Sequence, residues 1–489
     1  MSYEPVIGLE IHAELQTQTK MFCGCRRVDT TQASPNTSVC PVCLGYPGTL
    51  PVTNERAVEL ALRVALALGC QVLPISIFAR KNYFYPDLPK GYQISQYETP
   101  LASGGALRIF TEAGARTVHL RRVHLEEDTG KLTHAEGQPP ASLVDFNRAG
   151  VPLLEIVSEP DLFSAEEVKA YTTAVRRLLR YLQVNSGDME KGVIRFEANV
   201  SIRASGSREL GTRVEIKNLN SFRALMRAID YEVQRQSELV ARGERVVQET
   251  LGWDETRGET TTQRSKEEAH DYRYFPEPDL PPLHIDPAWL ERVRAELPEL
   301  PEARRERLIR EYGLNASEAE VIVEDRATAD FFEASARARP ALAARRLAAW
   351  LTSDLFGALN ALGRPLADEH GQPALAPAAF ADLVERVVRG EITGASGKAV
   401  LEEMLRSGRA AEAIVRERGL ERIGDAAALR DIVERVVREN AAQADQVRAG
   451  KHSVLQWLIG QVMKASRGRA DPHLVQALLE EDLLPREDG

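Results

Sequence analysis

The stretch VIGLEIHAEL, residues 6–15, places acidic and imidazole side chains at alternate positions. Successive side chains of a β-strand point to opposite faces, so Glu10, His12 and Glu14 would share one side while the aliphatic residues share the other. Two interpretations follow from this pattern. The three residues are either the solvated face of a half-buried strand, or one wall of a site that binds a metal or moves a proton.

Four of the five cysteines lie close together near the N-terminus. Cys23 and Cys25 form a C-x-C pair, and Cys40 and Cys43 form a C-P-x-C pair after a gap of fourteen residues. Each pair can present two thiolates from one turn, and two such turns can complete a tetrahedral Zn²⁺ site. The alternative, four unrelated thiols, leaves the ligand spacing unexplained. We predict a structural zinc, because four protein ligands leave no coordination position for a substrate.

A second acidic cluster occurs in VHLEEDTGK, residues 123–131. In a strand, Val123, Leu125 and Glu127 would share one face. A carboxylate in line with apolar side chains is costly to desolvate unless a cation or hydrogen-bond donors meet it, which makes Glu127 a candidate functional acid. An ordinary acidic turn explains the same residues equally well.

Two further segments, residues 193–203 and 211–218, alternate in the same way across a turn-rich connection. They predict a hairpin whose polar face combines Arg195 and Glu197 with Glu215 and Lys217. Solvated cross-strand ion pairs are the simpler interpretation of these residues.

The stretch RKNYFYPDLPKGYQISQY, residues 80–97, interleaves cations with aromatic side chains. Lys81 and Lys90 could neutralise phosphate and the aromatic faces could stack on bases, as a nucleotide or a single-stranded RNA end requires. Aromatic packing over a core accounts for the stretch equally well. The chain has neither a G-x-x-x-x-G-K-[ST] loop nor a G-x-S-x-G motif, so a P-loop and a serine nucleophile are not predicted.

The elements that must position these residues divide the chain by composition. Its 489 residues, 43% hydrophobic and 27% charged, are typical of soluble globular domains and too many for one ordinary core. Strand-like alternation with turns gives way near residue 290 to Ala, Leu, Glu and Arg at helical spacing. We predict an α+β fold: a mixed domain 1–290 with a zinc-binding insertion at 23–43, a helical domain 291–408 and a small helical tail domain 409–489.

Charge is distributed unevenly along the chain. A formal net charge of -10 argues against a protein that coats nucleic acid through its overall charge. Residues 446–470 nevertheless contain no carboxylate, and a patch of this kind suits phosphate contacts. Its Lys and Arg residues are Arg448, Lys451, Lys464, Arg467 and Arg469. No secretory signal or membrane span is evident, so we expect a cytoplasmic protein without membrane contact.

Taken together, six segments closely resemble the B subunit of the bacterial aspartyl/glutamyl-tRNA amidotransferases. The similarity runs along nearly the whole chain, and DFNRAGVPLLEIVSEPD is very specific to that family. The tail segment GKHSVLQWLIGQVMKASRGRADPHLVQALL matches the family's small C-terminal helical domain. The six segments are VIGLEIHAEL, RKNYFYPDLPKGYQISQ, HLEEDTGK, LVDFNRAGVPLLEIVSEPD, EIKNLNSF and DYRYFPEPDLPP.

The resemblance implies a cytoplasmic heterotrimer. An amidase (glutaminase) subunit releases ammonia from glutamine, a small third subunit braces the assembly, and the B subunit uses ATP to phosphorylate the side-chain carboxylate of Glu-tRNA(Gln) or Asp-tRNA(Asn). Ammonia then displaces phosphate to give Gln-tRNA(Gln) or Asn-tRNA(Asn). The mischarging aminoacyl-tRNA synthetase is a further candidate partner. The sequence leaves open which mischarged tRNA is the cellular substrate.

The resemblance also implies roles for individual residues. The first strand would line a Mg²⁺-dependent kinase site in a cradle-shaped domain, with Glu10, His12 and Glu127 at ligand positions. A His ligand is less typical of Mg²⁺, so His12 could instead orient a metal-bound water or accept a proton. The basic tail would bind tRNA. The remaining candidates are cations for the ATP phosphates and acids for metal or an ammonia channel: Lys81, Lys90, Arg195, Lys217, Glu197 and Glu215.

Two rival functions remain at this point. A non-catalytic scaffold that only holds tRNA would not need converging carboxylates. The archaeal relative that acts only on Glu-tRNA carries a large synthetase-like insertion, for which this chain has no room between its cradle and helical parts.

Overall fold

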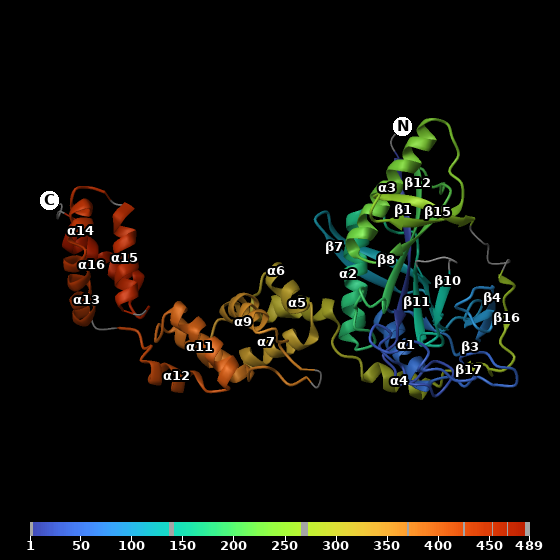
Figure 1. The fold of residues 1–489 in the computed structure, drawn as a ribbon, viewed down its shortest axis with the longest axis horizontal. Coiled ribbons are helices and arrows are strands. Elements are labelled where there is room, and N and C mark those ends of the chain that lie inside the picture. The colour runs from blue at the N-terminus through green and yellow to red at the C-terminus, as the bar shows by residue number, and fades with distance from the viewer. Residues whose placement is uncertain are drawn as a thin grey trace. The chain divides into compact units, whose positions relative to one another are not determined.

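The computed structural model describes residues 3–135, 141–265, 272–368, 371–423, 426–451, 453–466 and 468–484. The chain separates into two compact units, residues 1–300 and 301–489. The first unit is rich in strands and the second is helical throughout its described part, which confirms the predicted fold class (Figure 1). The division into three domains stays a prediction.

One large sheet with the strand order β15-β14-β13-β12-β1-β11-β8-β6-β2 organises the first unit, and β7 pairs with β8. Neighbouring strands are antiparallel except for the parallel pair of β13 and β14. The strands are β1 (Tyr3–Glu14), β2 (Gln71–Val72), β6 (Ala102–Ser103), β7 (Ala106–Thr111), β8 (Gly114–Glu127), β11 (Pro152–Ser158), β12 (Ile194–Ala204), β13 (Val214–Leu219), β14 (Glu249–Asp254) and β15 (Glu259–Ser265).

Strand β1 lies between β11 and β12, in the interior of the sheet. Its alternate residues Ile7, Leu9 and Ile11 are almost completely buried, and they join a single hydrophobic cluster with residues of four helices. Burial of each such side chain favours folding by about 1.5–3 kcal/mol. The predicted strand and the predicted hairpin of β12 with β13 are both confirmed.

Helices cover the apolar face of this sheet, and Figure 1 shows α2 and α3 along one side of the strands. The side chains of Asn54, Ser164 and Ser221 cap α1, α2 and α3 by accepting a hydrogen bond from an amide of the first turn. The helices of this unit are α1 (Glu55–Ala67), α2 (Ala165–Tyr181), α3 (Phe222–Ala241) and α4 (Pro287–Ala295).

A small three-stranded sheet, β16-β4-β5, lies beside the end of β8. Ser95 Oγ of β5 donates to Glu126 at 3.1 Å, and the Ile94 amide donates to Glu127 at 3.0 Å. The small sheets consist of β4 (Ala79–Asn82), β5 (Tyr92–Ser95) and β16 (Phe275–Pro276), of β9 (Lys131–Ala135) and β10 (Ala141–Asp145), and of β3 (Ile75–Ser76) and β17 (Leu283–His284).

The second unit contains two hydrophobic clusters. Helix α12, which the sequence assigned to the tail, buries Ala411, Ile414 and Val415 in the first of them. The second cluster involves α13 to α16. The helices are α5 (Pro301–Tyr312), α6 (Ala316–Ile322), α7 (Arg326–Ala338), α8 (Ala344–Ala349), a π-helical segment Trp350–Leu355, α9 (Phe356–Ala361), α10 (Pro377–Val388), α11 (Gly394–Ser407), α12 (Ala411–Arg418), α13 (Ala426–Glu439), α14 (Ala441–Arg448), α15 (Ser453–Ala465) and α16 (Pro472–Leu483).

Asn54 connects the cysteine-containing excursion to helix α1. Its Oδ1 accepts from the Ala57 amide, and its Nδ2 donates to the carbonyls of Thr19 and Lys20. Replacing the cap by alanine removes about 1–2 kcal/mol, so Asn54→Ala should accelerate hydrogen exchange in the first turn of α1 by about 5–30-fold.

Asn54→Asp provides the control for this experiment. It keeps the oxygen that caps the helix and removes the amide donors, so the first turn should exchange nearly as in the parent while residues 19–20 loosen. Equal exchange in Asn54→Ala and the parent chain would show that the cap does not hold this turn.

Candidate functional site

The polar face of the large sheet gathers most of the predicted site residues, because the register brings their positions together. Glu10 lies opposite Glu197, and His12 lies opposite Arg195 on β12 and opposite Glu155 on β11. Opposed residues of adjacent strands project from the same face. Side chains from three separate strands, most of them predicted site residues, therefore meet on one surface.

Glu10, Glu197 and Glu215 form the first acidic group, with one carboxylate oxygen of each within 4.8 Å of the others. Lys217 Nζ lies 2.8 Å from Glu197 and 3.9 Å from Glu215. Burial, followed by the charges of Glu155, Glu197 and Glu215, raises the pKa of Glu10. Although burial opposes ionisation of Glu197, Lys217 and His12 lower its pKa to about 2. The group thus holds more negative charge than its one lysine balances.

His12, Glu126 and Glu155 form a second group. His12 Nε2 lies 3.4 Å from Glu155 and 3.7 Å from Glu126, while His124 Nε2 lies 3.2 Å from the same Glu155 oxygen. Although burial opposes protonation of His12, its hydrogen bond to Glu155 and the nearby carboxylates raise its pKa to about 9. Burial likewise opposes ionisation of Glu155, but His124 and His12 hold its pKa well below the usual range.

The four predicted cations differ in whether a carboxylate is paired with them. Arg195 Nη2 lies 2.7 Å from Asp128, Lys217 Nζ lies 2.8 Å from Glu197, and Lys90 Nζ lies 2.5 Å from Glu127. Lys81 Nζ, in contrast, makes no hydrogen bond or ion pair within the described part of the chain. It lies instead 4.9 Å and 5.8 Å from the ring centroids of two tyrosines, Tyr272 and Tyr83.

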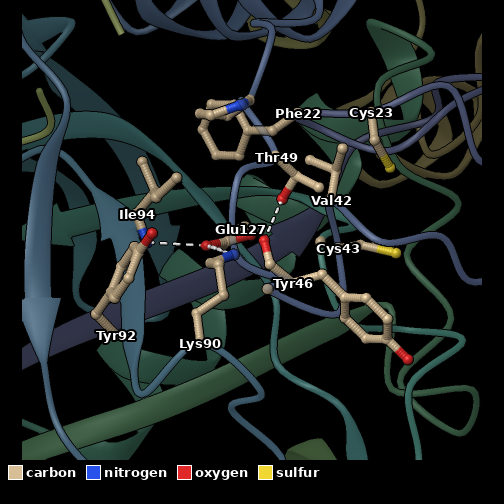
Figure 2. A pocket seen from close by; sticks show the side chains of 13 residues that line it. Phe22, Cys23, Val42, Cys43, Tyr46, Thr49, Lys90, Tyr92, Ile94 and Glu127 are labelled. Carbon is tan, nitrogen blue, oxygen red and sulfur yellow. Dashed lines mark hydrogen bonds and ion pairs between the residues drawn. The ribbon is translucent and has the colours of Figure 1, made fainter. Parts of the chain in front are cut away.

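Glu127 is not grouped with Glu10 and His12. Its carboxylate accepts from Lys90 and from the Ile94 amide, in a pocket that also includes Cys43 and Gly150 (Figure 2). Glu127 alternates with Glu126 along β8, and it is Glu126 that approaches His12. The functional role of Glu127 stays a prediction.

The four predicted zinc ligands do come together, with their sulfur atoms all within 4.8 Å of one another. Cys40 Sγ and Cys43 Sγ are 3.9 Å apart. Tetrahedral zinc with Zn–S bonds of about 2.3 Å requires sulfur separations of about 3.8 Å. The donor set and its spacing therefore fit zinc.

The cysteine-containing excursion is attached to the turn that precedes β11. The buried ammonium of Lys20 donates to the Phe146 carbonyl at 3.1 Å and lies 3.6 Å from Cys43 Sγ. The Ser38 amide donates to Asn147 Oδ1 at 2.8 Å. These contacts fix the cysteine cluster at one end of the large sheet.

Sequence reasoning missed Glu126 and Glu155 of the second group, and it missed the adjacent His124. An isolated acid inside the apolar run LLEIV was the signal for Glu155, because an unpaired carboxylate in such a strand is costly. The alternation of His124 with Glu126 was a weaker signal. Only the pairing of β8 with β11 shows that Glu155 lies next to both of these residues.

The predicted tRNA-binding cations lie at several positions of the tail. Lys451 and Lys464 are exposed, and Arg448 at the end of α14 pairs with Asp445 at 2.8 Å. Arg469 is half-buried and donates to the Ser466 carbonyl. Arg467 lies outside the described residues.

Comparison with known proteins defines the class of this chain. Residues 5–291 match the family described as the GatB/GatE catalytic domain, and residues 330–483 match the GatB domain. The first match contains all of the large sheet except the first two residues of β1, and it contains both acidic groups. None of the helices in the described ranges is long and apolar enough to cross a membrane.

Similarity to individual proteins over almost the whole chain identifies the family more closely. The chain is 53% identical over 484 residues to the B subunit of the aspartyl/glutamyl-tRNA(Asn/Gln) amidotransferase of Moorella thermoacetica, covering 99% of this chain and 100% of that protein. It is 50% identical to the protein of the same name from a Roseiflexus species, covering 99% of each. The chain belongs to the family of these B subunits, which confirms the resemblance drawn from its motifs.

The Lys90–Glu127 pair allows a test of the pocket geometry. Both side chains are largely buried, and breaking a buried pair leaves an uncompensated charge. Lys90→Met should destabilise the first unit by about 3 kcal/mol, and adding Glu127→Gln should recover much of the loss. Thermal unfolding of the three chains measures both effects.

Lys191→Met is the matched control, because it breaks an exposed pair with Asp29 in the same unit. It should leave the unfolding temperature unchanged. Additive losses in Lys90→Met and Glu127→Gln would contradict a coupled buried pair.

Proposed function

We propose that the polar face of the large sheet is a phosphoryl-transfer and amidation site acting on mischarged tRNA. The family makes the chain the B subunit of a tRNA-dependent amidotransferase, which bears out the predicted enzyme class. The proposal adds which steps of the reaction this subunit performs. This subunit phosphorylates the side-chain carboxylate of Glu-tRNA(Gln), Asp-tRNA(Asn) or both, and then directs ammonia onto the activated group.

The observation that carries this proposal is the convergence of two acidic groups near an uncommitted lysine, Lys81, which interacts electrostatically with Glu126 and Glu155. Six ionisable residues meet from strands far apart in the sequence: Glu10, Glu197, Glu215, His12, Glu126 and Glu155. Surface ion pairs need no such convergence. Phosphoryl transfer does need positioned charge, since its transition state develops little covalent chemistry for the protein to perform.

The reaction requires no nucleophile from this chain. A substrate carboxylate oxygen attacks the γ-phosphorus of ATP, the bond to the β-phosphate oxygen breaks, and ADP leaves. Ammonia then attacks the acyl carbon and phosphate leaves, which yields the amide after loss of a proton. The ammonium of Lys81 has its three N–H donors available for phosphate oxygens, because no carboxylate of the described residues occupies them.

The donor chemistry of the first acidic group fits Mg²⁺, since Glu10, Glu197 and Glu215 offer only carboxylate oxygens. Burial, together with repulsion from the neighbouring carboxylates, raises the pKa of Glu10, and a bound cation would relieve this unfavourable charge. Glu10, Glu197 and Glu215 would hold the ion, which would supply positive charge to offset that of the phosphate oxygens. The second group contains an imidazole and suits Mg²⁺ less well, so His12 is better placed to hold a proton near the reacting carboxylate.

The cysteine cluster supports a structural zinc rather than a catalytic one. Its four thiolates would complete a tetrahedral site without an open position, and Lys20 would offset part of their negative charge. We propose that the metal stabilises the excursion between β1 and α1 and thereby the turn at Phe146.

The remaining partners follow from the family and from the tail. We propose assembly with an amidase (glutaminase) subunit and a small third subunit in a heterotrimer, contact with the mischarging synthetase, and a cytoplasmic location. The basic tail residues would bind the tRNA backbone, an interaction that should weaken with salt.

Glu10→Gln tests the kinase assignment in the reconstituted complex. Removing this charge should lower tRNA-dependent ADP formation by about a hundredfold or more, because electrostatic positioning of phosphate is lost. Glutamine hydrolysis in the amidase should persist, as should tRNA binding. Ammonium chloride should not rescue the product, since an unphosphorylated carboxylate does not yield an amide.

Two comparisons sharpen this experiment. Glu4→Gln removes an acid of the same strand that pairs with Arg203, and it should leave ADP formation unchanged. Glu127→Gln separates kinase from ammonia transfer: ADP formation that persists, with product rescued by ammonium chloride, would assign Glu127 to the ammonia path. Normal ADP formation in Glu10→Gln would refute the kinase assignment.

Elemental analysis tests the zinc proposal. The purified chain should contain one zinc, and Cys40→Ser should lose it together with thermal stability of the first unit. Cys70→Ser is the control, because Cys70 is buried outside the cluster and its replacement should leave the zinc content at one. Absence of zinc from the parent chain would end the proposal.

A further inference from the structure

Lys81 is held differently from the other three cations of the site. Its Nζ faces the rings of Tyr272 and Tyr83, and these rings meet edge to face with centroids 6.1 Å apart. An aromatic face attracts an ammonium through the ring quadrupole. This contact occupies none of the N–H donors, whereas a carboxylate would occupy at least one.

The segment that carries Tyr272 is fastened to β4 on both sides of Lys81. Arg80 donates two hydrogen bonds to the buried carboxylate of Glu277, at 2.7 Å and 2.8 Å. Asn82 Nδ2 donates to the carbonyls of Tyr272 and Arg273 at 3.2 Å and 2.8 Å. The residues on either side of Lys81 therefore fix a segment about 190 positions further along the chain.

The aromatic contacts continue beyond this first ring. Tyr272 meets Tyr274 edge to face at 6.1 Å, and Tyr274 stacks on Tyr97 at 4.3 Å. Tyr97 lies just beyond β5, so the row of rings joins the segment to a second part of the small sheet. The ring of Tyr272 consequently has little freedom to turn away from the ammonium.

We propose that Tyr272 is a positioning residue for Lys81: its ring fixes the position of the ammonium while leaving the N–H donors free for substrate phosphate. This inference rests on the proposed phosphoryl transfer and identifies the side chain that aims its lysine. Tyr83 provides a second, more distant ring for the same ammonium.

Kinetics of tRNA-dependent ADP formation in the reconstituted complex test the inference. Tyr272→Leu should lower kcat by about tenfold, the size expected for a desolvated cation–π contact, with the KM values for ATP and tRNA nearly unchanged. Tyr272→Phe keeps the ring and should restore kcat. Tyr83→Leu should give a smaller loss, and it serves as the second variant where Tyr272→Leu proves unstable.

Phe110→Leu is the matched control, because it removes a ring that contacts Arg108 at 5.1 Å outside the site. It should leave kcat at the parental value, and thermal unfolding verifies that each variant is folded. A rise in KM without loss of kcat in Tyr272→Leu would mean that the ring contacts substrate instead, and would overturn the inference.

Lys81→Met separates failure of the inference from failure of the proposed function. An inactive Lys81→Met beside a fully active Tyr272→Leu would refute the positioning role and leave the kinase assignment standing. A fully active Lys81→Met would remove Lys81 from the proposed chemistry, and the positioning role would fall with it.

Discussion

The proposed site depends on the register of β1 between β11 and β12. A slip of one residue along either ladder would turn Glu10 and His12 into the core and bring Leu9 and Ile11 to the polar face. The buried aliphatic residues of β1 oppose that slip, since each favours its place by about 1.5–3 kcal/mol. The hydrophobic face thus determines where the charges lie, although it takes no part in the chemistry.

The charged face is stable because its groups neutralise one another in part. Lys217 lies between Glu197 and Glu215, and Asp128 accepts from Arg195, so burial of these side chains is offset by near contacts. The offset is incomplete around Glu10, whose pKa is raised. An incompletely balanced acid is poorly suited to stability and well suited to binding a cation.

Local sequence patterns predicted much of this arrangement. The remaining contacts depend on which strands pair with one another, and the sequence does not show that. Alternation in β1 and β12 predicted that Glu10, His12 and Glu197 lie on the polar faces of their strands, the family resemblance suggested their roles, and paired spacing predicted the cysteine cluster. The choice between Glu126 and Glu127 could not be made from sequence, because it depends on the register of β8 with β11 and on the position of β5. The contact of Lys81 with the Tyr272 ring could not be predicted from sequence either, because Tyr272 lies in a segment that no local pattern connects to β4.

The central place of β1 has a consequence for how the chain folds during synthesis. Tyr3 pairs with Ala204, so β1 lacks one neighbour until some two hundred further residues have been made. At usual elongation rates this delay is about 10–40 s, far longer than hydrophobic collapse of a short chain. An aliphatic strand exposed for that time is prone to pair with other chains. Of its two flanking strands β11 emerges first, so an antiparallel pair of β1 with β11 would protect one edge while β12 is still being translated.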